Sequence, residues 1–365
     1  MSITVCCLAA ASFAGEADKA VSISVNKSAA YQTIDGFGAH GAMDVWWGDG
    51  PFYNQAFLDR VIDDLGLTIV RNEYYPPDDN QCNFAKQAPY LQAMKQKAAA
   101  SGEPLKFIAT FWTPPAAFKD NNSLKEGGRA RPDHYADLGK YAVSAIAAYK
   151  DIGIDLYALS LQNEPNFREP YNSCVYNPAQ YRDMLKVAGP IIKKASPNTK
   201  IFGAEHMVWA LEWPDISYEG AIVKDPDAIK QMDIWACHGY GNDGRTPSAQ
   251  SKESHQWAAG CKNLAGTGKP LWMTETSGYK ENWKDAMQLA QSIYAALKYG
   301  KISAWVWWQM SEEGLGQYVL MNLGKPGKRY YVSKNYYRYI RPGAVMVDVA
   351  VGDESILATA FTHAE

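Results

Sequence analysis

Two glutamates in this sequence each follow a short apolar run, and together they could form a catalytic pair. Glu164 follows residues 159–163, Leu-Ser-Leu-Gln-Asn, and Glu275 follows residues 271–274, Leu-Trp-Met-Thr. A pair of carboxyls suits hydrolysis of a glycosidic bond, because one protonates the departing oxygen while the other attacks the anomeric carbon or activates a water. A glutamate of this kind can also cap a helix or pair with an arginine, so the surrounding elements must decide.

Eight short apolar or β-branched runs alternate with helical patterns along the 365 residues. Several of these runs are continuously hydrophobic, which is typical of parallel strands that are buried on both faces. We predict strands over residues 31–39, 67–73, 105–112, 155–162, 199–205, 232–238, 270–275 and 303–309.

The segments between these runs carry helix signals. Residues 134–152 have apolar side chains at helical spacing, residues 177–178 offer an asparagine cap followed by proline, and a helix over 283–299 would stop at Gly300. Eight strand-then-helix units predict an α/β fold, a (β/α)8 TIM barrel. A doubly wound open sheet is the alternative, but residues 36–38, Gly-Phe-Gly, do not continue into the phosphate-binding fingerprint that it would carry.

In such a barrel the carboxyl ends of the strands meet at one face, and chemistry is done there. Glu164 would end the fourth strand and Glu275 the seventh, so the two would face each other across the barrel mouth. Further candidates at or just beyond the strand ends are His40, Asp44, Arg71, Glu73, Trp112, Asn163, Glu205, His206, His238, Tyr240, Trp308 and Gln309.

An ordered set of motifs resembles one enzyme family. The motifs are residues 34–38, 112–115, 159–165, 238–241, 271–276, 305–308 and 339–347. They are similar, in this order, to stretches of clan A glycosidases, and in particular of glycoside hydrolase family 30. The resemblance runs from about residue 21 to residue 362, and within the family the bacterial xylanases are most similar.

The resemblance implies a retaining mechanism with Glu164 as acid/base, Glu275 as nucleophile and no cofactor or metal. It implies that Asn163 binds the sugar 2-hydroxyl and that Arg71 orients Glu275. Further residues implied or considered at the site are Tyr240 beside Glu275 and at the substrate, His238 as an orienting group, Trp112 and Trp308 as cleft walls, and Asp44, Trp47 and His206 as substrate contacts. Trp308 could equally be a core aromatic, and Trp46 and Trp47 could plug the barrel top.

The resemblance also implies a substrate, β-1,4-xylan or a related plant polysaccharide cleaved internally. Relatives that depend on a glucuronic acid branch place an arginine shortly after the Trp-Trp pair. Here Glu312 and Glu313 occupy this stretch and would repel a uronate, so we expect no glucuronate dependence. The alternatives are another β-glucan or β-galactan, an exo-β-glycosidase, or a sugar-binding barrel without catalysis.

Composition limits the partners. The formal net charge of −3 offers no basic excess for nucleic acid, and no apolar run is long enough to span a bilayer. The 12 Trp and 23 Tyr suit either a large core or a cleft that stacks on sugar rings. Cys82, Cys174, Cys237 and Cys261 lack zinc-site spacing, and they could form disulfides or remain free thiols.

The two ends of the chain differ from the barrel. We predict residues 1–17 as a signal-peptide remnant of a secreted protein, 18–30 as a strand of a side β-domain, 31–325 as the barrel and 326–365 as a partial side β-domain. A strand over 355–362 has no evident partner on its outer side. We therefore expect a monomer with low stability, or weak self-association through this edge.

Overall fold

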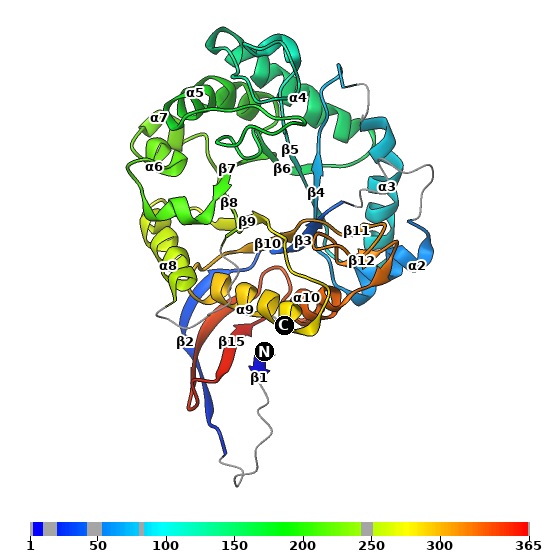
Figure 1. Ribbon diagram of the computed structural model, residues 1–365, viewed down its shortest axis with the longest axis vertical. Coiled ribbons are helices and arrows are strands. Elements are labelled where there is room, and N and C mark those ends of the chain that lie inside the picture. Colours follow the sequence, from blue (N-terminus) through cyan, green and yellow to red (C-terminus); the bar gives the residue numbers. More distant parts are fainter. Residues whose placement is uncertain (1–2, 10–19, 42–52, 80–83, 242–250, 364–365) are drawn as a thin grey trace.

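The computed structural model describes residues 3–9, 20–41, 53–79, 84–241 and 251–363, with side chains described from residue 20 onward. Its centre is a closed barrel of eight strands (Figure 1). In barrel order they are β10 (Ala304–Trp307), β3 (Gly36–His40), β4 (Ile69–Glu73), β5 (Lys106–Thr110), β6 (Leu156–Ser160), β7 (Lys200–Met207), β8 (Ile234–His238) and β9 (Leu271–Glu275). All neighbouring pairs are parallel. The predicted TIM barrel is confirmed.

Helices surround the barrel (Figure 1). The longer ones are α3 (Phe84–Ser101), α4 (Tyr135–Asp151), α5 (Pro178–Ala195), α8 (Lys252–Ala265), α9 (Trp283–Lys298) and α10 (Lys328–Tyr337), and the shorter ones are α2 (Gln55–Leu58), α6 (Tyr218–Val223) and α7 (Pro226–Ile229). A short π-helix, η1 (Asp59–Asp64), and the 3-10 helices η2 (Ala116–Phe118), η3 (Pro132–His134) and η4 (Val208–Glu212) lie in the segments that connect strands and helices. The cap predicted at residues 177–178 is a full capping box with Gln180.

Apolar side chains from alternate strand positions fill the interior of the barrel, among them Ile69, Phe202 and Trp272. Glycine is required at position 38 because a Cβ there would overlap the Ile69 carbonyl oxygen. Helix α10 docks onto the same strand, since the Tyr337 hydroxyl donates a hydrogen bond to the Gly38 carbonyl at 2.9 Å. Residues 328–337, predicted to belong to the side domain, therefore pack on the barrel.

A four-stranded antiparallel sheet lies beside the barrel, beyond α9 (Figure 1). Its order is β1 (Ile3–Ala9), β15 (Ile356–Thr362), β14 (Val345–Val351) and β2 (Ile23–Thr33). The expectation that residues 355–362 lack a partner is wrong, because β1 pairs along the whole of β15. This strand lies inside the segment predicted as a signal-peptide remnant, and short apolar runs are typical of strands and of signal peptides alike.

A small sheet of β11 (Ser311–Glu312), β12 (Met321–Asn322) and β13 (Lys325–Pro326) follows the last barrel strand.

Cys174, Cys237 and Cys261 are free thiols, and Cys82 lies outside the described residues. Of the helices that the structure describes, none has the length and apolarity needed to cross a bilayer.

Candidate active site

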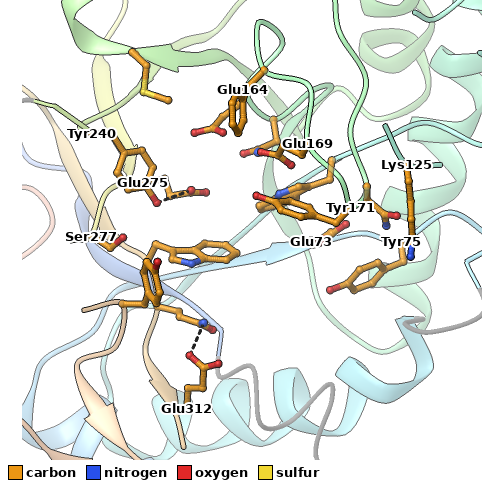
Figure 2. Close-up of a pocket in the computed structure, with 18 of the residues that line it drawn as sticks. Glu73, Tyr75, Lys125, Glu164, Glu169, Tyr171, Tyr240, Glu275, Ser277 and Glu312 are labelled. Atoms are coloured by element: carbon orange, nitrogen blue, oxygen red, sulfur yellow. Dashed lines mark hydrogen bonds between the residues drawn. The ribbon is translucent and has the colours of Figure 1, made fainter. Parts of the chain in front are cut away.

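The carboxyl ends of the barrel strands open into a cleft of about 620 Å³ (Figure 2). Its lining combines carboxyl groups with aromatic rings, which suits a sugar because the rings pack on apolar sugar faces while polar groups bind hydroxyls. The described lining residues are Glu73, Tyr75, Asp79, Trp112, Lys125, Asn163, Glu164, Phe167, Glu169, Tyr171, Asn172, Met207, Tyr240, Glu275, Ser277, Trp308, Gln309, Glu312 and Tyr318.

Glu164 and Glu275 face each other in this cleft. Glu275 is the last residue of β9, and Glu164 lies just beyond β6 with a backbone φ of 40°, which turns its side chain into the cleft. Both are largely buried, with exposed fractions of 7% and 6%. One carboxyl oxygen of each lies within 4.8 Å of the other. Glycosidases that use a covalent intermediate have carboxyls about 5–5.5 Å apart, whereas inverting enzymes need about 6.5–9.5 Å.

Arg71 organises the floor of the site. It is fully buried on β4 and donates hydrogen bonds to Glu275 at 2.5 Å, to Asn163 at 2.9 Å and to Glu205 at 3.0 Å. Although burial acts in the opposite direction, the charge of Arg71 contributes most to lowering the pKa of Glu205 to about 2. One guanidinium therefore fixes the orientation of a carboxylate and an amide that face the cleft.

His238, the last residue of β8, touches both carboxyls of the pair. Its Nδ1 lies 2.8 Å from Glu164 and 3.9 Å from Glu275, and its Nε2 lies 3.6 Å from Glu205. Burial favours the neutral ring, but these three carboxylates outweigh burial and raise the pKa of His238 to about 10. The raised pKa favours the imidazolium form of the ring, which places a positive charge between these carboxyls.

The two facing carboxyls have opposite preferences for a proton. Burial raises the pKa of Glu164, but the hydrogen bond and charge of His238 outweigh it and hold this pKa below its ordinary value. Burial raises the pKa of Glu275 above its ordinary value, although His238 and Arg71 oppose this. The Tyr240 hydroxyl donates to Glu275 at 2.9 Å (Figure 2). Without a bound substrate, Glu164 is thus the more readily ionised of the two.

Aromatic rings form one wall of the cleft. Trp112 lies over the Arg71 guanidinium, 4.8 Å from ring centroid to cation, and packs against Trp308 at 5.7 Å. Trp308 is partly exposed and lines the cleft. His40 lies beneath, with its ring 4.2 Å from that of Trp308. Burial holds the pKa of His40 well below its ordinary value, so this ring is neutral.

One expected substrate contact lies elsewhere. His206 is buried outside the described cleft lining, with its Nδ1 3.2 Å from Glu219 and its ring against Tyr218. The expectation placed His206 just beyond a strand ending at residue 205, whereas β7 continues to Met207, with a bulge in its pairing with β8 between Ala204 and His206. Asp44, Trp46 and Trp47 lie outside the described residues.

Several lining residues went unrecognised in the sequence. Glu73 was visible as a strand-end residue but had no assigned role, and burial raises its pKa to about 8. Lys125, Glu169 and Tyr171 come from the loops after β5 and β6. Loop residues carry no strand or helix period, so only the folded chain brings them to the cleft.

Comparisons with known proteins agree with this geometry. Residues 76–322 match the model of the glycosyl hydrolase family 30 TIM-barrel domain. The chain belongs to glycosyl hydrolase family 30. Within this family it is 27% identical to glucuronoxylanase XynC of Bacillus subtilis, over 89% of this chain and 71% of that protein.

Two further relatives differ in the substrates that their names give. A family 30 subfamily 8 xylanase, Xyn30A from Clostridium acetobutylicum, is 26% identical with a TM-score of 0.73, covering 90% of this chain and 77% of that one. The lysosomal acid glucosylceramidase of Mus musculus is 24% identical over 72% of this chain and 53% of that protein. Membership of family 30 therefore makes this chain a glycoside hydrolase, while its relatives differ in substrate.

Proposed function

We propose that this family 30 enzyme hydrolyses β-glycosidic bonds with retention, with Glu164 as the acid/base and Glu275 as the nucleophile. The observation that carries the proposal is the short separation of the two carboxyls, within 4.8 Å, in a cleft lined by aromatic rings. This distance leaves no room for a water between Glu275 and the anomeric carbon, so direct attack by the carboxylate fits better.

The surrounding residues fit the two steps. In the first step Glu164 gives a proton to the departing oxygen while Glu275, held by Arg71 and Tyr240, bonds to the anomeric carbon. In the second step Glu164 takes a proton from a water, and the water oxygen displaces Glu275. Asn163 lies 2.9 Å from Arg71, where its amide can bind the 2-hydroxyl of the reacting sugar.

Replacement of Glu164 by alanine tests the acid role. We expect kcat/KM on a substrate with an alkoxide leaving group to fall about 10²–10⁴-fold, because this is the usual contribution of a general acid. A dinitrophenyl glycoside leaves without protonation, so its first step should persist and release a burst of phenolate. Stopped-flow absorbance measures the burst, and equal losses on both substrates would contradict the role.

For the substrate, we propose internal cleavage of xylan without dependence on a glucuronate branch. Similarity to XynC and Xyn30A supports xylan. The charge of the cleft supports independence from the branch. Glu312 lines it and accepts a hydrogen bond from Gln309 at 3.2 Å (Figure 2), and Lys125 is the sole cationic side chain in the described lining. A uronate near Glu312 would meet like charge.

Matched polymers test this substrate assignment. We expect rates on unbranched xylan or arabinoxylan to lie within about threefold of the rate on glucuronoxylan. An enzyme that bound the uronate through an ion pair would instead lose roughly tenfold in rate for each 1.4 kcal/mol of that interaction. Product sizing separates internal cleavage, which gives mixed oligomers, from release of single sugars. A strict need for the uronate would refute the proposal, and turnover of another β-glucan or β-galactan alone would point to the alternative substrates.

We further propose that the enzyme is secreted, because a polysaccharide too large to enter a cell must be cut outside it. Mass spectrometry of the protein from a native culture medium tests this. Detection only inside the cells would contradict it.

A further inference from the structure

Glu169 lies in the loop between β6 and α5, and its backbone is held in place. Its carbonyl accepts a hydrogen bond from the Glu126 amide at 3.0 Å and another from the Ser173 hydroxyl at 3.0 Å. Its own amide donates to the Ser173 oxygen at 3.1 Å. The side chain is only 2% exposed although it lines the cleft. Such a residue is positioned by the fold and does not sample the solvent.

The Glu169 carboxyl lies next to that of Glu164 (Figure 2). Each of these two buried carboxyls shifts the pKa of the other, and both line the same cleft. Oxygen Oε2 of Glu169 is buried and finds no donor in the described part of the chain. Two ionised carboxylates only accept hydrogen bonds, so these two can bond to each other only when one of them carries a proton. Two neighbouring buried negative charges would also repel each other, which favours a shared proton.

We propose that Glu169 is a positioning residue that stores the proton delivered by Glu164 to the departing oxygen. The inference rests on the proposed role of Glu164 as acid/base. Glu164 and Glu169 together hold one proton, which lies on Glu169 in the resting enzyme and moves to Glu164 when a glycosidic oxygen is bound beside it.

The surrounding charges favour this arrangement. Burial, and then the charge of Glu164, raise the pKa of Glu169 to about 9, while the His238 imidazolium favours the ionised form of Glu164. The proton therefore rests on the carboxyl of Glu169 in the resting enzyme. The charged and titratable groups around the pair are Tyr171 on the same loop, Arg71 on β4, His238 on β8, Glu275 on β9 and Lys125 on the loop after β5.

The proton balance closes over one turnover. In the first step the proton passes from Glu169 to Glu164 and on to the departing oxygen as the C–O bond breaks and the bond to Glu275 forms. Both Glu164 and Glu169 are then ionised beside His238. In the second step the attacking water loses a proton to Glu164, its oxygen bonds to the anomeric carbon, and Glu275 leaves as a carboxylate. Return of this proton to Glu169 restores the resting pair.

The substitution Glu169→Gln tests the proposal, because the amide preserves size and can donate to Glu164 but cannot give up a proton. Glu164 then ionises alone beside His238, at lower pH than the pair. We expect the pKa that defines the alkaline limb of the kcat/KM profile to fall by at least about one unit for an oligosaccharide or a glycoside with an alcohol leaving group. At pH values above this limb, such a shift corresponds to a tenfold loss of kcat/KM. The first step on a dinitrophenyl glycoside should keep its alkaline limb, since it needs no proton.

Two controls complete the experiment. Glu126→Gln removes the same charge from the neighbouring loop, outside the cleft lining, and should leave the limb in place. Glu169→Asp keeps a carboxyl and should restore part of the shift. Infrared difference spectra between the wild type and E169Q provide a readout that needs no substrate, because the wild type should show one additional protonated carboxyl band, which disappears near pH 9.

The outcomes separate this inference from the proposed function. An active E169Q enzyme whose alkaline limb matches the wild type, or whose infrared spectrum shows no lost carboxyl band relative to the wild type, would overturn the storage role while leaving Glu164 as acid/base. An E164A enzyme that loses nothing on alkyl-type substrates would overturn the proposed function itself.

Discussion

Replacement of Glu275 by alanine is expected to lower kcat/KM about 10⁴–10⁶-fold, the scale of loss when a hydrolase loses its nucleophile. The reason is geometric, since Glu275 is the carboxylate that Arg71 and Tyr240 aim into the cleft. Binding of an oligosaccharide should persist, because the aromatic wall of Trp112 and Trp308 is untouched. Initial rates and isothermal calorimetry measure the two effects.

Azide rescue makes this prediction specific to the role. In E275A, azide can occupy the space of the lost carboxylate and attack from the same side, so a β-linked substrate should yield an α-glycosyl azide. In E164A, azide should instead attack the covalent intermediate from the opposite side and yield a β-glycosyl azide. Proton NMR of the products distinguishes the two. Unchanged activity of E275A, or the reverse pairing of products, would contradict the assignment.

The second large effect is expected for Arg71→Met. The side chain is fully buried and hydrogen-bonds to Glu205, Glu275 and Asn163. Removal of one partner from a buried ion pair leaves an uncompensated charge and typically costs about 3–5 kcal/mol of unfolding free energy. Urea unfolding monitored by tryptophan fluorescence measures the loss, and activity should fall as well because Glu275 loses its orienting donor.

The double variant R71M/E205Q is the matched control. Glu205 is fully buried and depends on Arg71 for its low pKa, so its neutral replacement should recover part of the lost stability. It should not recover activity, because Glu275 still lacks its guanidinium partner. A stability loss below about 1 kcal/mol in R71M, or an additive loss in the double variant, would show that the charge network is not what holds this region together.

The residues that the sequence identified best are those attached directly to barrel strands. Glu275, Arg71 and His238 lie at or near strand ends, where parallel pairing aligns carboxyl ends and leaves little choice of direction. Asn163 and Glu164 lie within four residues of the end of β6 and share this advantage. His206 shows the limit, because β7 extends past the predicted strand end and holds this residue inside the strand, outside the described cleft lining.

Residues on loops depended on the folded chain. Glu169 and Tyr171 reach the cleft only because Ser173 and Glu126 hold the loop after β6 in one conformation. The fate of Trp308 was also undecided, since an aromatic after a strand packs equally well in a core or a cleft. At the other end of the molecule, the pairing of β1 with β15 joins residues from opposite ends of the chain, and no local pattern specifies such a partner.

The sequence by itself determined the barrel and the identity of the facing carboxyls, Glu164 and Glu275, because strand periodicity and strand ends are local properties that a short motif encodes. Only the tertiary structure decided which of the carboxyls in the site carries a proton. The protonation of Glu164 depends on His238 and Glu169, which lie on different segments, and on burial that exists only after folding. Charge and desolvation act through space, so they appear only once the chain has brought these groups together.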